Sequence, residues 1–153
     1  MNSVGHLEET SIMTEQNKQL LLKDICARLP YGVICRYTTA IPLLGEVLNY
    51  GPLQEIRRKG EYFTVNGADC LYEDIKPYLR PMSSMTDEEK KEFDDFCVID
   101  EFAWNGNSEI GYKNQAFIMS DAIDWLNAHH FDHRGLIPMG LAFEASKGMY
   151  KTE

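Results

Sequence analysis

Cysteine motifs are missing from this sequence, although four cysteines are present. Cys26, Cys35, Cys70 and Cys97 form neither a C-x-x-C pair nor half of a zinc ribbon. Each lies beside apolar or aromatic residues, so we expect free thiols that fill a hydrophobic core. The pattern therefore disfavours both a structural zinc site and the disulfide framework of a small secreted domain.

Long hydrophobic runs are missing too. The longest apolar stretches cover only a few residues, far short of the roughly 20 residues that a membrane-spanning helix needs. Residues 1–13 are largely polar and lack the basic start and apolar stretch of a secretory signal. We expect a disordered tail over residues 1–13 and a single domain over residues 14–153, located in the cytoplasm and away from membranes.

The short motifs of common enzyme classes do not occur either. The glycines form neither the phosphate-binding loop G-x-x-x-x-G-K-[ST] nor the dinucleotide fingerprint G-x-G-x-x-G. No serine lies in the strand–turn–helix setting of a nucleophile, and no cysteine has an adjacent base that would make it reactive. We therefore expect no cofactor, and the lack of these motifs favours a protein that is not an enzyme.

Positive charge is scarce, and negative charge is concentrated in one segment. The chain has 15 Lys and Arg against 24 Asp and Glu, a formal net charge of −9. Residues 86–124 hold eleven acidic residues against three lysines, a net of −8. Direct nucleic-acid binding needs a basic surface that neutralises phosphates, so we expect none. The only basic run, Arg57, Arg58 and Lys59, lies at a predicted turn and is typical of a solvated loop.

The first half of the domain predicts one helix followed by a small sheet. A helix is expected from about residue 15 to 29, with Leu22, Ile25, Cys26 and Leu29 on its buried face. Pro30 and Gly32 should end it. Four short strands are then expected at residues 33–38, 43–50, 53–58 and 61–65, with a turn at residues 51–52. Tight turns between consecutive strands indicate an antiparallel, meander-like sheet.

Two prolines, Pro77 and Pro81, lie in the segment that follows, at residues 75–82. They argue against a regular helix or a central strand there, so we expect an extended piece docked onto the sheet. Thr86 and Glu89 form a capping box that starts a second helix. Phe93, Phe96 and Cys97 should be its buried edge.

The second half of the chain predicts a third helix. Short strands are expected near residues 98–99 and 102–104, and Ser120 is a plausible N-cap. One face of the helix should be buried; it comprises Ala122, Trp125, Leu126 and His129. About three helices with a four-stranded antiparallel sheet make the predicted fold class α+β.

A histidine cluster follows this helix and is the first candidate site. It comprises His129, His130, Asp132 and His133. One further helical turn would bring His129 and His133 onto one face, as metal sites require. Gly135 and the expected helix start indicate instead that the helix ends near His130, where imidazoles satisfy free carbonyl groups. We therefore interpret the cluster mainly as structural, with a metal or small-molecule ligand as the alternative.

The acidic segment is the second candidate site. Its strongest run comprises Asp87, Glu88, Glu92, Asp94 and Asp95. Such a run commonly serves solubility as a solvated helix face. It would also suit a surface that meets a basic partner protein, because complementary charge raises the association rate and the selectivity.

Several segments resemble a known group of proteins. Residues 124–137, DWLNAHHFDHRGLI, residues 140–142, and residues 76–86, KPYLRPMSSMT, resemble signatures of small uncharacterised proteins of gut Bacteroidales. Residues 24–33 match as well. Many of these proteins are linked to prophages and other mobile elements. The resemblance implies membership of such a family; it implies no activity and no catalytic residues.

These observations leave three hypotheses. The leading one is a non-enzymatic protein-interaction module of a phage or mobile element that binds a host protein through residues 86–124. The alternative is a small-molecule-binding domain or metal-assisted hydrolase centred on His129, Asp132 and His133. The third is a structural or self-assembling protein, and the sequence leaves its oligomeric state open.

Overall fold

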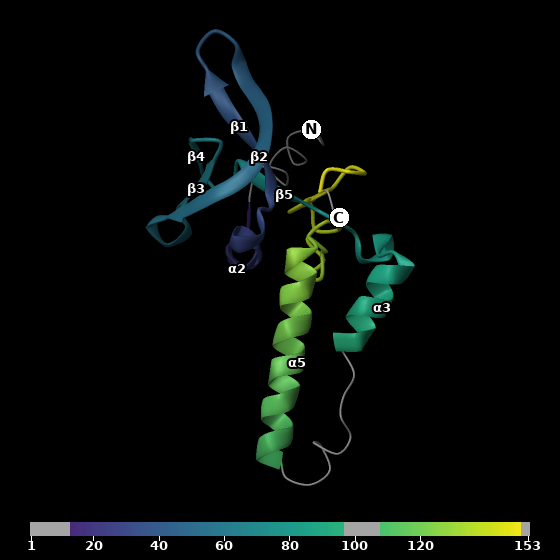
Figure 1. Cartoon of the computed structure of the whole chain (residues 1–153). Coiled ribbons are helices and arrows are strands. Elements are labelled where there is room, and N and C mark those ends of the chain that lie inside the picture. Colours follow the sequence, from purple (N-terminus) through teal and green to yellow (C-terminus); the bar gives the residue numbers. More distant parts are fainter. Residues whose placement is uncertain (1–12, 97–107, 151–153) are drawn as a thin grey trace, which may run out of the picture. The chain divides into compact units, whose positions relative to one another are not determined.

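The structure of the protein, a computed structural model, describes residues 13–96 and 108–150 (Figure 1). The chain divides into two compact units. Unit 1 comprises the chain up to Tyr78 together with Arg134–Glu144, and unit 2 comprises Leu79–His133 and the chain from Ala145 onwards. The described residues contain three α-helices and a six-stranded sheet, so the α+β class is confirmed.

Helix α2, Glu15–Arg28, begins and ends at the expected places in unit 1. Thr14 caps its N-terminus, since its side chain accepts a hydrogen bond from the Asn17 backbone N–H at 3.1 Å. A short 3₁₀ turn, η1 (Leu29–Tyr31), follows, and Gly32 takes a left-handed conformation with φ 68°. The proline and glycine after the helix therefore stop it as predicted.

The buried face of α2 differs from the prediction. Its buried residues are Leu21, Asp24, Ile25 and Arg28. Cys26 is exposed instead of filling the core. The observed buried face thus lies one residue closer to the N-terminus than the predicted one. The prediction used apolar residues only, and it therefore missed Asp24 and Arg28, which are buried together as an ion pair.

Two of the other cysteines follow the prediction. Cys35 and Cys70 are free and buried. Burial raises the pKa of both thiols, that of Cys70 to about 11, so neither forms a reactive thiolate at neutral pH. Cys97 lies outside the described residues.

The sheet has six strands in the order β4-β3-β2-β1-β5-β6, two strands more than expected. Its strands are β1 (Ile34–Ile41), β2 (Gly45–Arg57), β3 (Tyr62–Val65), β4 (Ala68–Cys70), β5 (Ile75–Leu79) and β6 (Phe143–Glu144). The pairs β1–β2, β1–β5, β2–β3 and β3–β4 are antiparallel. A 3₁₀ turn, η2 (Arg58–Gly60), joins β2 to β3, at the hairpin connection that the sequence predicts.

The turn expected at residues 51–52 does not exist, because both residues lie inside strand β2. Gly51 pairs with Cys35 and Pro52 with Ile34 of β1. The side chain of Asn66 packs against Gly51 so closely that a Cβ would collide with it. Glycine at position 51 therefore permits a close approach rather than a turn.

Pro52 is tolerated in this strand because of the direction in which its nitrogen points. Leu53 donates its N–H to the carbonyl of Val33, the residue just before β1, at 2.8 Å. Successive backbone N–H groups on a strand point to opposite sides, so the nitrogen of Pro52 faces away from β1 and no β1–β2 hydrogen bond is lost.

The prediction that the two prolines of residues 75–82 argue against a central strand was also wrong. Strand β5 lies between β1 and β6 in the sheet, and Pro77 pairs with Cys35. Strand β6 contains only two residues, so β5 is close to an edge strand, where proline is tolerated.

The core of unit 1 forms between α2 and one face of the sheet. Its fully buried apolar residues are Leu21, Ile25, Val33, Cys35, Phe63, Val65, Ile75 and Leu136. Helix α2 also packs on the β2–β3 connection, where a Cβ on Gly60 would lie 2.5 Å from a methyl carbon of Leu22. A side chain there would displace Leu22, and the positive φ of 95° at Gly60 favours glycine in any case.

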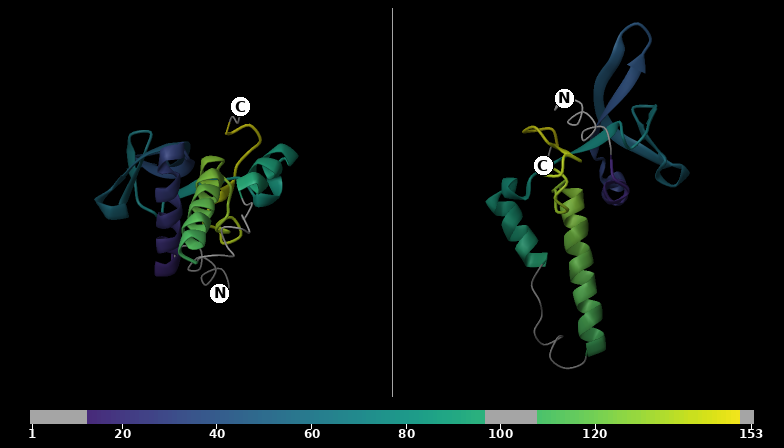
Figure 2. Two further views of the ribbon diagram at one scale, coloured as in Figure 1. Left: turned by 60° about the horizontal axis from the view of Figure 1, so that its bottom comes forward. Right: turned by 180° about the vertical axis from the view of Figure 1, so that it is seen from behind.

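Unit 2 contains a 3₁₀ turn, η3 (Met82–Ser84), and the helices α3 (Asp87–Phe96) and α5 (Ser108–Ala128). The views in Figures 1 and 2 show α3 and α5 side by side. Helix α5 starts twelve residues before the predicted N-cap, so Ser120 lies inside it. The strands predicted near residues 98–104 lie outside the described residues. None of the described helices combines the length and hydropathy needed to cross a bilayer.

The core of unit 2 is largely aromatic. Trp125, Leu126 and Phe131 form a buried cluster, against which Met85 and Phe93 pack. Ala122, Trp125 and Leu126 are buried as predicted for the third helix, whereas His129 is half-buried and lies beyond the end of α5. Of the predicted edge of the second helix, Phe93 is half-buried as expected, and the other two side chains lie outside the described part of the chain.

Candidate functional site

Helix α3 is anchored in unit 2 through one side of its surface. Glu89 and Thr86 form the predicted capping box, in which each backbone N–H donates to the other side chain at 3.1 Å. Arg80 donates two hydrogen bonds to the Glu89 carboxylate, at 2.7 and 2.8 Å. Further along the helix, the ring of Phe93 lies 5.5 Å from that of Trp125. These contacts leave the remaining surface of α3 facing solvent.

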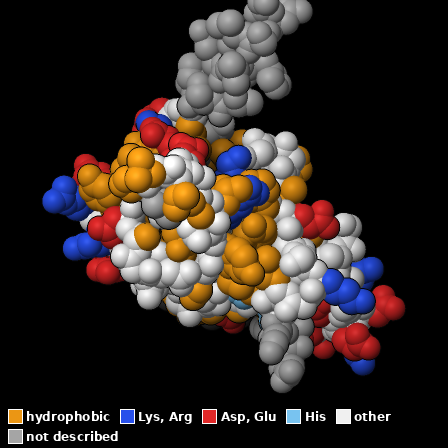
Figure 3. Space-filling model, turned by 90° about the horizontal axis from the view of Figure 1, so that it is seen from above, with side chains coloured by type: hydrophobic (Ala, Val, Ile, Leu, Met, Phe, Trp, Pro, Cys, Tyr) orange, Lys and Arg blue, Asp and Glu red, His pale blue; other side chains and the backbone are white. Residues whose placement is uncertain are grey.

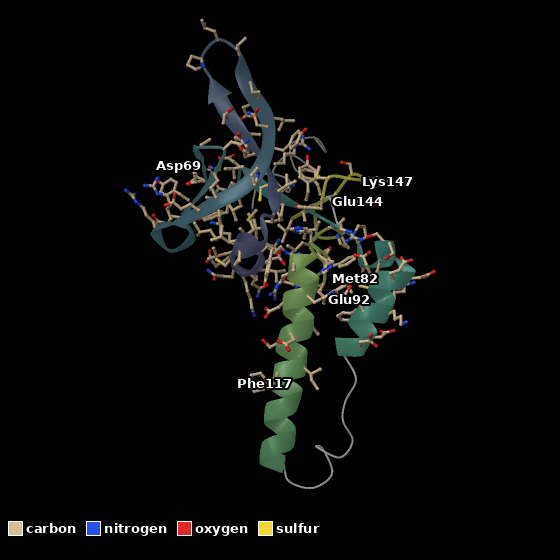
Figure 4. The ribbon with its side chains drawn as sticks, viewed as in Figure 1. Asp69, Met82, Glu92, Phe117, Glu144 and Lys147 are labelled. Atoms are coloured by element: carbon tan, nitrogen blue, oxygen red, sulfur yellow. The ribbon has the colours of Figure 1, made fainter. Side chains whose placement is uncertain are left out.

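The predicted acidic residues all lie on that remaining surface. Asp87, Glu88, Glu92, Asp94 and Asp95 are exposed. Lys90 and Lys91 are also exposed, so the open surface of α3 carries five negative and two positive charges. Figure 4 labels Glu92 on this helix. We call this set of five exposed acids the α3 acidic surface.

Glu89 is not part of the α3 acidic surface, although it belongs to the same run. Its side chain is 14% exposed, and the Arg80 guanidinium lowers its pKa to about 2, with help from the Thr86 hydrogen bonds. The residue therefore serves as an anchor. Glu89 thus differs from the five exposed acids of the α3 acidic surface.

The histidine cluster lies at the end of α5, where its rings make local hydrogen bonds. Nδ1 of His129 is 2.9 Å from the Trp125 carbonyl oxygen, and the two rings stack at 3.9 Å. Nε2 of His133 is 2.8 Å from Oδ1 of Asn127. Because α5 ends at Ala128, His129 and His133 do not share a helix face. The helix end predicted near His130 is thus confirmed.

His130 and Asp132 are both about nine-tenths buried. The ring of His130 stacks on Tyr150 at 3.6 Å, and its backbone has a positive φ of 63°. The backbone of this segment pairs with Arg80, which donates to the His130 carbonyl at 2.7 Å and accepts from the Asp132 N–H at 2.8 Å. Within the described ranges, no three His, Cys, Asp or Glu side chains converge as a metal site requires.

An ion-pair cluster that the sequence reasoning missed lies in unit 1. The Arg28 guanidinium donates twice to the Asp24 carboxylate, at 2.8 and 3.1 Å, and both side chains are fully buried. Nε of Arg134 lies 3.2 Å from the same carboxylate. The i,i+4 spacing of Asp24 and Arg28 was the available signal, but it is common on exposed helix faces as well.

The outer face of the sheet also gathers side chains that the sequence did not connect. Arg36 of β1 and Lys76 of β5 both lie over the ring of Phe143 in β6, at 4.6 and 5.2 Å. A hollow of about 160 Å³ opens beside them. Its lining includes two acids, Glu73 and Asp74, as well as the two cations. The hollow is smaller than the roughly 300 Å³ of typical small-molecule sites, and its mixed charge favours no single ligand class.

The basic run at residues 57–59 is partly neutralised. Arg57 lies 3.2 Å from Asp69, which Figure 4 labels, and 3.8 Å from Glu55. These groups are about half exposed, so the pairs contribute little stability. Arg58 lies over the ring of Tyr62 at 5.5 Å. The arrangement fits the solvated turn that the sequence predicts.

Comparisons of the chain with family models, with curated proteins and with solved structures found no match.

Proposed function

We propose that the protein is a protein-binding module that uses the α3 acidic surface to bind a basic surface of its partner. The main support for this proposal is the way in which the acidic side chains are distributed over the surface of α3. The acid with a structural partner, Glu89, faces inwards, and the five others face solvent. Acids that stabilise the helix itself belong in its first turn, a role open to Asp87 and Glu88 but not to Glu92, Asp94 or Asp95.

The anchoring of α3 supports the same proposal. A bidentate ion pair and a ring contact hold the helix in unit 2. Charges on a fixed helix lose less conformational freedom on binding than charges on a loose segment do, which favours affinity. The resemblance to proteins of mobile elements in gut Bacteroidales makes a host protein the partner that we propose.

Affinity capture with matched variants tests this function. The tagged chain is used to capture proteins from a Bacteroidales lysate, and the captured proteins are quantified by mass spectrometry as salt rises. A variant with Glu92→Gln, Asp94→Asn and Asp95→Asn should lose most of its specific partner. Salt should release the wild-type complex, because exposed charges are screened.

A second triple variant separates local charge from total charge. Glu61→Gln, Glu73→Gln and Glu144→Gln change exposed acids of unit 1 and also remove three negative charges. This variant should capture as much partner as the wild type does. Equal loss in both variants, or loss in neither, would contradict the assignment to α3.

The alternative, a ligand-binding or metal-assisted hydrolase site at His129, Asp132 and His133, has less support. The rings of His129 and His133 already hydrogen-bond to groups of α5, and a hydrolytic zinc needs three protein ligands. Elemental analysis of protein purified without a chelating tag tests it. Stoichiometric zinc, nickel, iron or manganese that is lost in a His129→Ala, His133→Ala variant would revive this alternative.

A further inference from the structure

Strands β1 and β2 form an arm that extends beyond the rest of the sheet (Figure 1). The two strands pair with each other from Ile34↔Pro52 to Ile41↔Gly45. By contrast, β5 pairs with β1 only up to Tyr37, and β3 pairs with β2 only from Leu53 onwards. Thr38 still donates its N–H to the Asp74 carbonyl, and Tyr50 contacts Asn66 and Tyr78. The outer part of the hairpin, residues 39–49, is therefore a two-stranded ribbon. Such ribbons are marginally stable alone in water.

The outer edge of β2 has backbone groups available for another strand. Leu53 N–H points to β1, and the register is continuous along the hairpin. By alternation, the N–H and C=O groups of Glu46, Leu48 and Tyr50 point away from β1. The Tyr50 carbonyl accepts from the Asn66 side chain at 3.2 Å. Among the described residues, no strand lies beside Glu46 and Leu48 on this side.

Apolar side chains are exposed along the same arm. The exposed fractions are 106% for Leu43, 74% for Leu44, 56% for Leu48 and 65% for Tyr50. Figure 3, seen from above Figure 1, shows hydrophobic side chains at the surface. Soluble proteins usually protect a free edge with charge or proline. Between residues 37 and 54 the only charged residue is Glu46, and the two prolines, Pro42 and Pro52, lie at the tip and at the base of the arm, so neither interrupts the edge at Glu46 and Leu48.

The tip of the arm keeps a leucine in an unfavourable backbone conformation. Leu43 has φ 74°, a region in which a bulky side chain is strained and asparagine or glycine is preferred. Its side chain is fully exposed, so no described residue packs against it. Strain without an internal contact indicates that the leucine serves a contact outside this chain.

A second copy of the chain fits this edge for two reasons. An antiparallel pair of identical edges is self-complementary, since each copy offers the same N–H and C=O groups to the other. In addition, two copies with a net charge of −9 each repel one another. The arm carries only one charged residue, Glu46, so contact between two arms brings few like charges close together. We infer that the protein self-associates through the outer edge of β2, with Leu43, Leu44 and Leu48 buried between the two copies.

Sedimentation equilibrium over a range of protein concentrations tests the inference. The wild type should show a monomer–dimer equilibrium, and Leu48→Lys should weaken it at least about tenfold, because a lysine on a strand edge opposes pairing. Leu43→Asn should weaken the dimer as well, while thermal stability measured below the dimer dissociation constant stays equal or rises, since the strain at position 43 is relieved. That combination excludes misfolding as the cause.

Leu71→Lys provides the matched control, because Leu71 is an exposed leucine of unit 1 outside the arm. It should leave dimerisation unchanged. Amide hydrogen exchange should show Glu46 and Leu48 becoming protected as the protein concentration rises. A wild type that stays monomeric would overturn the inference, as would a dimer insensitive to Leu48→Lys or one that leaves these two amides unprotected.

Discussion

Arg80 shows how much one side chain can organise in unit 2. Its guanidinium holds the Glu89 carboxylate with two hydrogen bonds, lies 4.2 Å from the Phe131 ring centre, and reaches the His129 carbonyl at 3.4 Å. A planar group with five donors can make all these contacts at once, which a lysine cannot. One arginine thus links the start of α3 to the segment that follows α5.

The Arg80–Glu89 pair predicts a specific loss of stability in acid. Glu89 has a pKa of about 2 in the folded protein, against 4.5 for the unperturbed group. Since the folded pKa is the lower one, the stabilisation is complete above about pH 4.5 and is lost as the pH falls towards 2, by up to about 1.4 kcal/mol per pH unit. Urea unfolding across this range should show a shallower pH dependence for Glu89→Gln. Parallel profiles for the variant and the wild type would contradict this.

Helix α2 illustrates how a charged pair can belong to a core. Asp24 and Arg28 are one turn apart on its inner face, and Arg134 reaches Asp24 from the far end of unit 1's sequence. Buried charges are tolerated when each has a close partner of opposite sign. The cluster therefore fixes which face of α2 packs inwards, which the apolar spacing alone misplaced.

Removing the carboxylate of this cluster should be costly. Asp24→Asn leaves two guanidinium groups without the negative charge that both face, so we expect a loss of about 3–5 kcal/mol in the free energy of unfolding. Chemical denaturation measures it. Lys23→Gln, at an exposed position on the same helix, should change stability by less than about 0.5 kcal/mol. A loss below about 1 kcal/mol for Asp24→Asn would show that the cluster contributes little.

At the scale of the whole molecule, two surfaces of different chemistry are distributed over the two units. The α3 acidic surface belongs to unit 2 and the apolar arm to unit 1. If both proposals hold, the net charge of −9 acts on the two interactions in opposite ways, because it attracts a basic partner and repels a second copy.

Salt should therefore separate the two interactions. Raising the ionic strength from about 0.05 M to about 0.5 M shortens the Debye length from roughly 14 Å to roughly 4 Å. The complex through α3 should weaken, while the dimer should strengthen because repulsion between copies is screened. Partner capture and sedimentation at both ionic strengths measure the two effects. A dimer that dissociates as salt rises would contradict the apolar interface.

Local signals account for the parts of the fold that sequence reasoning predicted. The stop after α2, the capping box at Thr86 and the end of α5 near His130 each depend on residues within a few positions of one another. The exposure of the five acids on α3 followed from their charge, since isolated carboxylates are rarely buried. The sequence also indicated the α+β class through its change from helical to strand-like patterns.

Only the tertiary structure decided the features that depend on distant partners. Pro77 lies in a strand because β1 and the two-residue β6 flank β5. Gly51 and Pro52 continue β2 because they pair with Cys35 and Ile34 of β1, and the Asn66 side chain packs against Gly51. The partner of Arg134 is Asp24, 110 positions away. Local sequence does not determine which distant segment will pair with a strand. The glycine and proline at residues 51–52 were therefore assigned to a turn, and the two prolines of residues 75–82 to an extended piece outside the sheet.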